Sequence, residues 1–185
     1  MSGIANLVIV LIVFPYFIRS LDKAVDIAFL LYKKNRYLQA LSRSELSLED
    51  LYYLTPMEFE EWSARFLQKM GYNDINVTSA GPDGGKDIIC SLNGEKVYVE
   101  CKRYALRLSS PFKVNPDIVR RLVGAMPHDN ISKGIIITTG IITDSAKACL
   151  ASLPDGLSIT VFDGHNLVKE FNMLPHNERL QTAGT

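Results

Sequence analysis

The chain has 185 residues, enough for one domain with a buried core and an additional segment. Its 20 basic and 20 acidic side chains cancel, which excludes a protein that attracts nucleic acid through its overall charge. The three cysteines, at positions 90, 101 and 149, have no CxxC spacing and are expected to be buried reduced thiols in a cytosolic domain. The charge is nevertheless uneven, with acids concentrated in residues 45–61 and bases in residues 101–121.

The first 40 residues differ from the rest. Residues 4–18 carry no charge and would form a helix only about 22 Å long, shorter than the ~30 Å hydrocarbon core of a bilayer. Basic residues follow this run and none precedes it, so the positive-inside rule keeps the following chain in the cytoplasm. We expect residues 1–40 to form a short hydrophobic membrane anchor, with residues 24–32 amphipathic or interfacial. The alternatives are a helix packed on the domain and a helix buried in an oligomer interface.

Residues 41–54 are expected to form a linker that enters a short helix. Thr55-Pro56-Met57-Glu58 has the residues of a capping box with proline at the first helical position, so a helix is predicted from residue 56 to Gly71. Its apolar residues recur at helical spacing and predict core contacts: Phe59, Trp62, Phe66 and Met70.

Further elements follow from turn residues and apolar periodicity. The predicted strands are residues 74–79, 87–92, 96–103, 134–139 and 158–162, and the predicted helices are residues 115–125, 143–152 and 164–171. This order predicts an α/β fold with a mixed central sheet flanked by helices on both faces. Residues 174–185 are expected to be a C-terminal tail.

Asn93-Gly94 separates two alternating apolar runs, and this is the strongest short-range signal for a hairpin because both central turn residues need positive φ. With a two-residue loop, Leu92 pairs with Glu95, Asp87 lies opposite Glu100, and Lys102 points to the same face. Opposed carboxylates repel, which suggests a bound divalent cation held by both carboxylates and the Cys101 carbonyl oxygen. A solvated sheet edge is the alternative interpretation.

Two neighbouring features bear on this candidate site. Glu60 flanks the apolar stripe of its helix, although on sequence alone a solvated helix carboxylate is the favoured interpretation. Residues 81–86 are rich in glycine but lack both nucleotide-binding spacings and lead into a strand, so a nucleotide-binding loop is excluded. Beside a metal site, the bases between Lys102 and Arg121 would form a rim that binds phosphate.

From Pro56 to Phe171 the pattern resembles the Mrr-like restriction endonuclease domain of the PD-(D/E)xK nuclease superfamily, over about two thirds of the chain. The matching segments, in order, are Phe59-Glu60, Gly71-Tyr72, Gly81-x-Asp83-Gly84-Gly85-x-Asp87, Glu100-x-Lys102-Arg103, Gly124-Ala125 and Thr138-Thr139-Gly140 through Ser145-Ala146. The resemblance implies an αβββαβ core and DNA cleavage that depends on Mg²⁺ or Mn²⁺. It implies metal ligation by Asp87 and Glu100, and catalytic roles for these two residues, Lys102 and Glu60. Many members of the family carry Gln at the position of Glu100.

We therefore expect residues 55–173 to be a metal-dependent endodeoxyribonuclease, tethered to a membrane and acting in restriction or DNA defence. The expected location is the cytoplasmic side of a bacterial inner membrane, with a soluble cytoplasmic protein as the alternative. Two other functions stay open: a non-catalytic DNA-binding or sensing module, and an interaction protein that uses acidic residues 45–61. A homodimer would allow double-strand cleavage, as would two sequential nicks. The expected DNA contacts are Lys86, Arg103, Arg107, Lys113, Arg120 and Arg121.

Overall fold

The computed structural model describes residues 2–42, 46–78, 86–104 and 113–175, and within these ranges all side chains except those of residues 2–13, 37, 40–42 and 128. The chain divides into two compact units, residues 1–38 and 39–185. The glycine-rich segment 81–85, Arg107 and most of the expected C-terminal tail lie outside the described residues.

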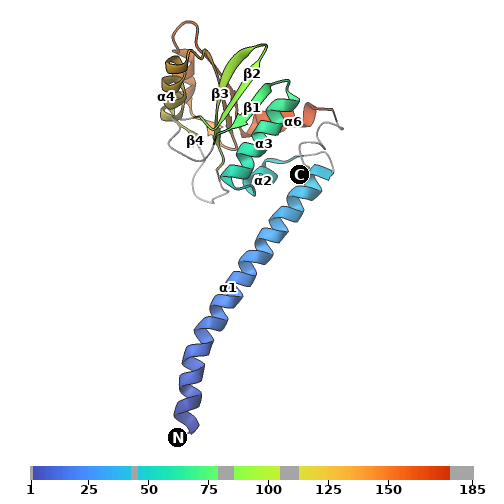
Figure 1. Ribbon diagram of the computed structural model, residues 1–185, viewed down its shortest axis with the longest axis vertical. Coiled ribbons are helices and arrows are strands. Elements are labelled where there is room, and N and C mark those ends of the chain that lie inside the picture. Colours follow the sequence, from blue (N-terminus) through green and yellow to red (C-terminus); the bar gives the residue numbers. More distant parts are fainter. Residues whose placement is uncertain (1, 43–45, 79–85, 105–112, 176–185) are drawn as a thin grey trace. The chain divides into compact units, whose positions relative to one another are not determined.

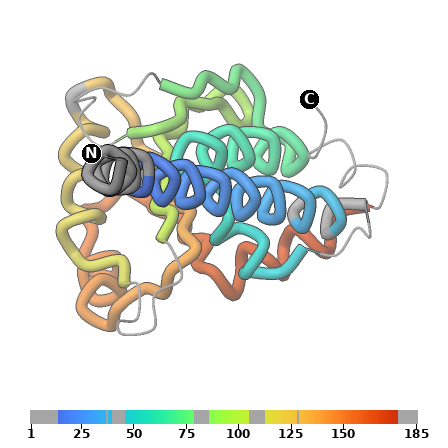
Figure 2. Tube along the Cα trace, turned by 90° about the horizontal axis from the view of Figure 1, so that it is seen from below, coloured from blue at the N-terminus to red at the C-terminus, as the bar shows by residue number. Residues whose placement is uncertain are grey.

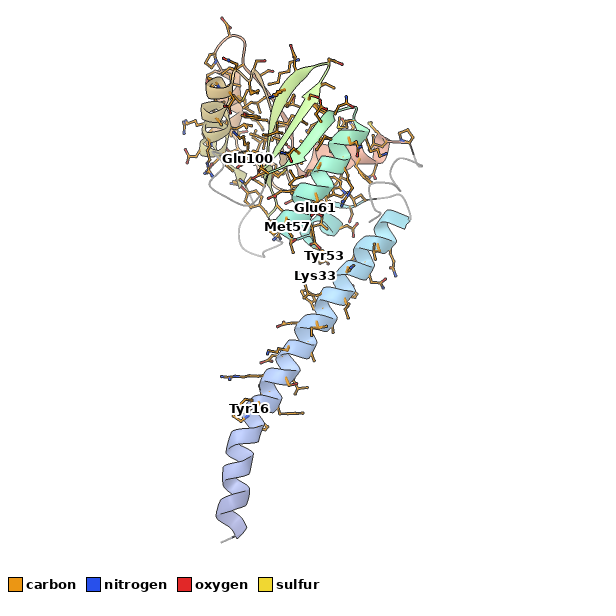
Figure 3. The ribbon with its side chains drawn as sticks, viewed as in Figure 1. Tyr16, Lys33, Tyr53, Met57, Glu61 and Glu100 are labelled. Carbon is orange, nitrogen blue, oxygen red and sulfur yellow. The ribbon has the colours of Figure 1, made fainter. Side chains whose placement is uncertain are left out.

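Helix α1 (Ser2–Ser42), which contains Pro15, makes up nearly all of the first unit and ends in the first residues of the second (Figure 1). Apart from the half-buried Lys33, its described side chains are exposed, and most are apolar, as Tyr16 illustrates (Figure 3). The residues from Phe29 to Tyr32 are large, apolar and exposed, and the amphipathic or interfacial character expected of residues 24–32 stays a prediction. Among the side chains that the structure describes, no helix is both long enough and apolar enough to cross a membrane. Residues 4–13 of the expected anchor lie outside those side chains.

The second unit contains the remaining elements, labelled in Figure 1 where space allows. They are α2 (Leu48–Tyr52), α3 (Pro56–Lys69), β1 (Asn73–Val77), β2 (Ile88–Leu92), β3 (Glu95–Lys102), β4 (Lys113–Val114), α4 (Pro116–Ala125), η1 (Pro127–Asp129), β5 (Lys133–Thr138), β6 (Ile141–Ile142), α5 (Asp144–Ala151), β7 (Ser158–Phe162) and α6 (Gly164–Met173). The five long strands form one sheet in the order β1-β2-β3-β5-β7, antiparallel from β1 to β3 and parallel from β3 to β7. This confirms the predicted mixed sheet and the order of its main elements.

The hairpin of β2 and β3 has the predicted turn. Asn93 and Gly94 have φ values of 53° and 82°, and Leu92 pairs with Glu95. The ladder then continues in regular register to the pair formed by Ile88 and Val99. The local turn chemistry therefore determines which side chains of the two strands share a face.

Helices cover both faces of the sheet, with α3 and α4 on different sides of the strands (Figures 1 and 2). On one face, Trp62 stacks between Phe59 and Phe66, contacts Phe171 of α6, and all four rings are completely buried. Thr55 and Glu58 form the predicted capping box at the start of α3. On the other face, side chains from the sheet, α4 and α5 form a second core: Tyr98, Val114, Ile118, Val119, Leu122, Met126, Ile131, Ile136 and Ala146.

Residues 46–54, which we expected to form a linker, pack on the domain instead. Leu46 and Leu51 are 3% and 0% exposed. Both backbone polar groups of Leu46 bond to the Asn172 side chain, each at 3.1 Å. The physical reason is that the amide of Asn172 in α6 offers one donor and one acceptor, a partnership across 126 residues that no local pattern reveals. The predicted boundary at residue 55 thus leaves out a packed segment.

Candidate active site

The predicted carboxylates meet where β2 begins and β3 ends. The Asp87 N–H donates to the Val99 carbonyl oxygen at 2.8 Å, and the Asp87 Oδ2 atom accepts from the Cys101 N–H at 2.6 Å. Val99 also pairs with Ile88, so two successive residues face one partner, as in a β-bulge. The direct pairing of Asp87 with Glu100 that we expected is replaced by this bulged end, which turns the Asp87 carboxylate onto the backbone of β3.

Lys102 lies among the groups that we predicted as metal ligands. Its Nζ atom is 2.6 Å from Glu100 Oε1 and 3.8 Å from Asp87 Oδ2. It also donates to the Cys101 carbonyl oxygen at 3.2 Å. The Glu100 side chain is only 2% exposed, whereas that of Lys102 is 30% exposed. The structure therefore brings two carboxylates and one carbonyl oxygen around a single ammonium group.

The pKa values of this group follow from burial and mutual charge. Burial raises the pKa of Glu100, Asp87 raises it further, and the hydrogen bond from Lys102 opposes this rise. Burial by itself would lower the pKa of Lys102, but the hydrogen bond and the charges of Glu100 and Asp87 outweigh burial and raise it. Lys102 is consequently a cation at neutral pH and stabilises the ionised carboxylates.

Glu60 lies on helix α3 and is electrostatically coupled to the groups at the hairpin end. Burial is the main cause that raises its pKa; Asp87 and Glu100 raise it further, and Lys102 lowers it. These mutual effects place Glu60 within electrostatic range of all three hairpin groups. The next residue, Glu61, is exposed (Figure 3), so the two neighbouring glutamates of α3 have different surroundings.

Buried threonines at the end of β5 hold the backbone beside the site. Thr138 Oγ1 donates to the Lys102 carbonyl oxygen at 2.8 Å, and Thr139 Oγ1 accepts from the Tyr104 N–H at 2.8 Å. Both threonines are at most 1% exposed. In the sequence these two threonines belong only to the family pattern. The signal for their structural role is the presence of two hydroxyls directly after a buried apolar strand, because buried hydroxyls need hydrogen-bond partners.

Of the predicted DNA contacts that the structure describes, three have exposed side chains and two have side chains bound within the domain. Arg121, on α4, is exposed and close enough to lower the pKa of Glu100. Lys113 and Arg120 are also exposed, and Arg120 pairs with Asp117 at 2.9 Å. These three side chains are accessible to a large ligand.

Lys86 and Arg103 are instead bound within the domain. The Lys86 ammonium lies 3.3 Å from Asp129 Oδ2 and 4.5 Å from the centre of the Tyr98 ring, and the Tyr98 hydroxyl also donates to Asp129. Arg103 Nη1 donates to the Tyr52 carbonyl oxygen at 3.5 Å. The sequence did not predict these partners, and contact of either side chain with a phosphate stays a prediction.

The residues at the hairpin end fit a small divalent cation. Within the described part of the chain, no group of three or more His, Cys, Asp or Glu side chains could hold a metal. Two carboxylates and a carbonyl oxygen are nonetheless suitable for Mg²⁺ or Mn²⁺, which keep several waters or phosphate oxygens as ligands. Glu100 Oε2 is buried and, among the described residues, has no hydrogen-bond partner. An unpaired buried carboxylate oxygen costs free energy that a cation would offset.

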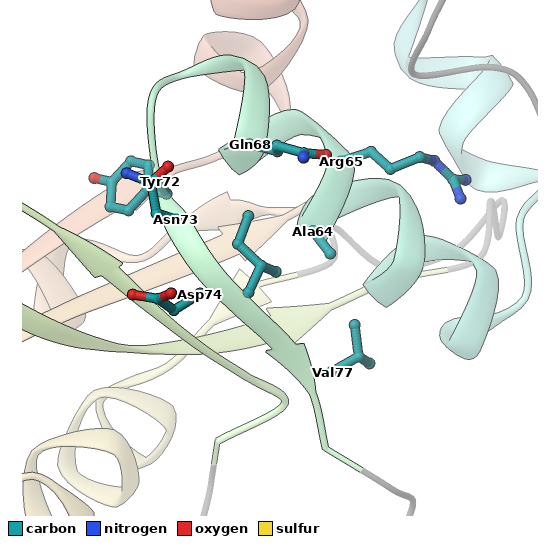
Figure 4. A pocket seen from close by; sticks show the side chains of 8 residues that line it. Ala64, Arg65, Gln68, Tyr72, Asn73, Asp74 and Val77 are labelled. Atoms are coloured by element: carbon teal, nitrogen blue, oxygen red, sulfur yellow. The ribbon is translucent and has the colours of Figure 1, made fainter.

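A separate hollow of about 350 Å³ lies between α3 and β1 (Figure 4). Its lining residues are Ala64, Arg65, Gln68, Tyr72, Asn73, Asp74, Ile75 and Val77. None of them is a predicted site residue. The hollow is therefore distinct from the carboxylate cluster.

Comparisons with known proteins agree with this architecture. Residues 51–171 match the family model Mrr_cat, described as "Restriction endonuclease". Among solved structures, the chain is similar to "DNA modification-dependent restriction endonuclease AspBHI", with a TM-score of 0.50 and 18% identity over 78% of this chain and 38% of that one. It also matches "MspJI Restriction Endonuclease in Complex with 27-mer Oligonucleotide", with a TM-score of 0.45 and 19% identity over 69% of this chain and 29% of that one.

None of the curated proteins compared with the chain matches it. The match to AspBHI shows a shared fold, and the chain spans less than half the length of either of those two proteins. The family match, by contrast, extends from α2 through α6 and includes the whole carboxylate cluster. The chain therefore belongs to the restriction endonuclease family.

Proposed function

We propose that this protein is an endodeoxyribonuclease that depends on Mg²⁺ or Mn²⁺. The observation that supports the proposal best is the convergence of Asp87, Glu100, the Cys101 carbonyl and Lys102 at one end of the hairpin. A solvated sheet edge would not bury Glu100 to 1% exposure beside a second carboxylate. Such an arrangement is costly for folding and is typical of a site that binds a cation.

The proposed chemistry is hydrolysis of a DNA phosphodiester: the oxygen of a water forms a bond to phosphorus and loses a proton to solvent, while the bond from phosphorus to one deoxyribose oxygen breaks and that oxygen leaves with a proton. Asp87, Glu100 and the Cys101 carbonyl would hold the ion, which lowers the pKa of bound water and stabilises negative charge on the phosphate. Lys102 would donate a hydrogen bond to a non-bridging phosphate oxygen and stabilise the charge that develops there. Glu60 would bind and orient water at the α3 side of the site.

DNA would approach over the exposed bases of α4 and β4. Arg121 is the best placed because its charge already acts on Glu100, and Lys113 and Arg120 would contact phosphates further along the strand. We propose Lys86 and Arg103 as secondary contacts, because each has a partner within the domain. Arg107 completes the proposed set and lies outside the described residues.

The test is cleavage of supercoiled plasmid by the full chain with Mg²⁺ or Mn²⁺, compared with Asp87→Asn. Asp144→Asn is the matched control, since it makes the same change at an exposed acid paired with Lys147 on α5. We expect the wild type and the control to nick or linearise the plasmid and Asp87→Asn to do neither, with circular dichroism showing that all three are folded.

Equal cleavage by Asp87→Asn would disprove the assignment of the site. DNA binding that weakens with salt, without cleavage under any metal condition, would support a non-catalytic DNA-binding or sensing module instead. Sedimentation of the same samples would show whether linear product arises from a homodimer or from two successive nicks by a monomer.

We also propose that α1 attaches the protein to a membrane, with the nuclease domain on the cytoplasmic side. The proposal is supported by the exposed apolar side chains of the helix and by its basic residues Arg19, Lys23, Lys33, Lys34 and Arg36. We expect the full chain to sediment with vesicles that contain anionic lipid and a chain of residues 39–185 to remain in the supernatant. Sedimentation of both chains, or of neither, would contradict this role of α1.

A further inference from the structure

The position of the Lys102 ammonium has a consequence for metal binding. Its three oxygen neighbours belong to Glu100, Asp87 and Cys101, at 2.6, 3.8 and 3.2 Å. These are the same three groups that would hold a divalent ion. A small ion binds such oxygens at roughly 2.0–2.1 Å, so an ion shared by the carbonyl and the two carboxylates would lie where the ammonium lies now.

We propose that Lys102 acts as the resident cation of this site and that a divalent metal binds only after displacing its ammonium group. Lys102 then sets the metal affinity of the site in addition to any part in cleavage. The inference rests on the proposed function to the extent that it takes the hairpin end as the metal site. It concerns occupancy of the site, which can be measured without DNA.

The surroundings of Lys102 allow this exchange. Thr138 Oγ1 holds the Lys102 carbonyl oxygen at 2.8 Å, so the backbone of this residue is fixed. The side chain is 30% exposed, which leaves its flexible stem a route toward solvent. A rotation of the side chain is therefore sufficient to remove the ammonium, and Glu100 and Asp87 can stay in place.

The charges of the cluster cause a divalent metal and the Lys102 ammonium to compete for the same carboxylates. Two carboxylates share one ammonium, and burial with mutual repulsion already raises the pKa of Glu100. Removing the ammonium leaves both carboxylates available to an added metal and removes the repulsion between two cations within one site. A lysine that instead assisted metal binding would give the opposite result, because its loss would weaken the metal complex.

The test is titration of Mn²⁺ into the full chain, followed by calorimetry, for the wild type, Lys102→Met and Lys147→Met. Lys147 is the matched control, a lysine in an exposed ion pair with Asp144 at 3.0 Å. We expect Lys102→Met to bind Mn²⁺ at least about tenfold more tightly than the wild type, and Lys147→Met to bind it with wild-type affinity. Glu100→Gln in the Lys102→Met background should abolish the gain, which would locate the ion at this site.

A second measurement covers the case in which Lys102→Met is poorly folded without metal. The thermal midpoint of Lys102→Met should then rise more on addition of Mn²⁺ than that of the wild type, while Lys102→Arg, which keeps the charge, should respond like the wild type. Unchanged or weaker Mn²⁺ affinity in Lys102→Met, or an equal thermal shift, would overturn the inference.

Failure of the inference and failure of the proposed function give different results. If the wild type cleaves plasmid but Lys102→Met shows no gain in Mn²⁺ affinity, the result would support the nuclease proposal and contradict the displacement of the ammonium by metal. If Lys102→Met binds Mn²⁺ more tightly but the wild type does not cleave DNA under any metal condition, the result would support the displacement of the ammonium by metal and contradict the nuclease proposal.

Discussion

Strand β3 carries an acid–lysine pair near each of its ends, and the two pairs differ in burial rather than in length. Near the turn, Glu95 and Lys133 of β5 are 2.5 Å apart with side chains 57% and 46% exposed. At the opposite end, Glu100 and Lys102 are 2.6 Å apart with side chains 2% and 30% exposed. An exposed pair contributes about 0–1 kcal/mol to stability because water solvates both ions in any arrangement.

Burial raises the free-energy cost of leaving the charge of Glu100 without a partner. Glu100 has lost its solvent, so it depends on Lys102, on a bound cation or on protonation to avoid an uncompensated charge. The second oxygen of Glu100 is buried without a described partner, in contrast to the solvated carboxylate of Glu95. The comparison teaches that a short ion pair indicates function only where its surroundings make the charge costly.

The largest expected difference between the two ends is in DNA cleavage. Glu100→Gln removes one proposed metal ligand with little change in size, and we expect plasmid cleavage in Mg²⁺ to fall at least about a hundredfold. Glu95→Gln makes the identical change at the exposed pair and should cleave at the wild-type rate. Initial rates of loss of supercoiled plasmid measure both. If the two variants lost activity equally, the distinction between the ends would fail.

A smaller difference is expected in the pH dependence of stability without metal. Because the pKa of Glu100 is raised in the folded state, its protonation favours folding. This contribution is complete below the ordinary glutamate pKa of the unfolded chain and is lost as pH rises through the raised value. The free energy of unfolding of the wild type, relative to Glu100→Gln, should therefore decline as pH increases from about 4 through the raised pKa.

The measurement is urea denaturation at a series of pH values in the presence of a chelator. Glu95→Gln makes the same change at the exposed pair and is again the control. If the free energy of unfolding of the wild type, relative to Glu100→Gln, instead rises with pH, then the attraction of Lys102 outweighs burial and repulsion. The ionised Glu100 carboxylate would then stabilise the fold.

Local signals correctly predicted the frame of the site. The turn at Asn93-Gly94 fixed the register of β2 and β3 through the φ values of two residues. The capping box of Thr55 and Glu58 placed the start of α3, and apolar spacing identified Phe59, Trp62 and Phe66 as core. Met70, the last residue of the predicted stripe, is only half-buried because the helix ends before it.

Long-range contacts account for the features that local sequence patterns could not predict. The partner of Lys86 is Asp129, 43 positions away, and the partner of Arg103 is the Tyr52 carbonyl, 51 positions away. The bulge at Asp87 depends on its bonds to the β3 backbone, so a count outward from the turn could not include it. Arg121 was chosen from a run of bases, but its closeness to Glu100 follows from how α4 packs on the sheet.

The sequence by itself determined the hairpin, the capped helices, the order of the elements and the identity of the charged residues at the strand end, because short hydrogen bonds and residue periodicity act between near neighbours. Only the tertiary structure decided that Glu100 is buried, that Lys102 lies among three oxygen ligands, and that Thr138 holds its backbone. Burial and electrostatic coupling are properties of the space around an atom, and the segments that fill this space come from α3, α4 and β5, which are distant in the chain.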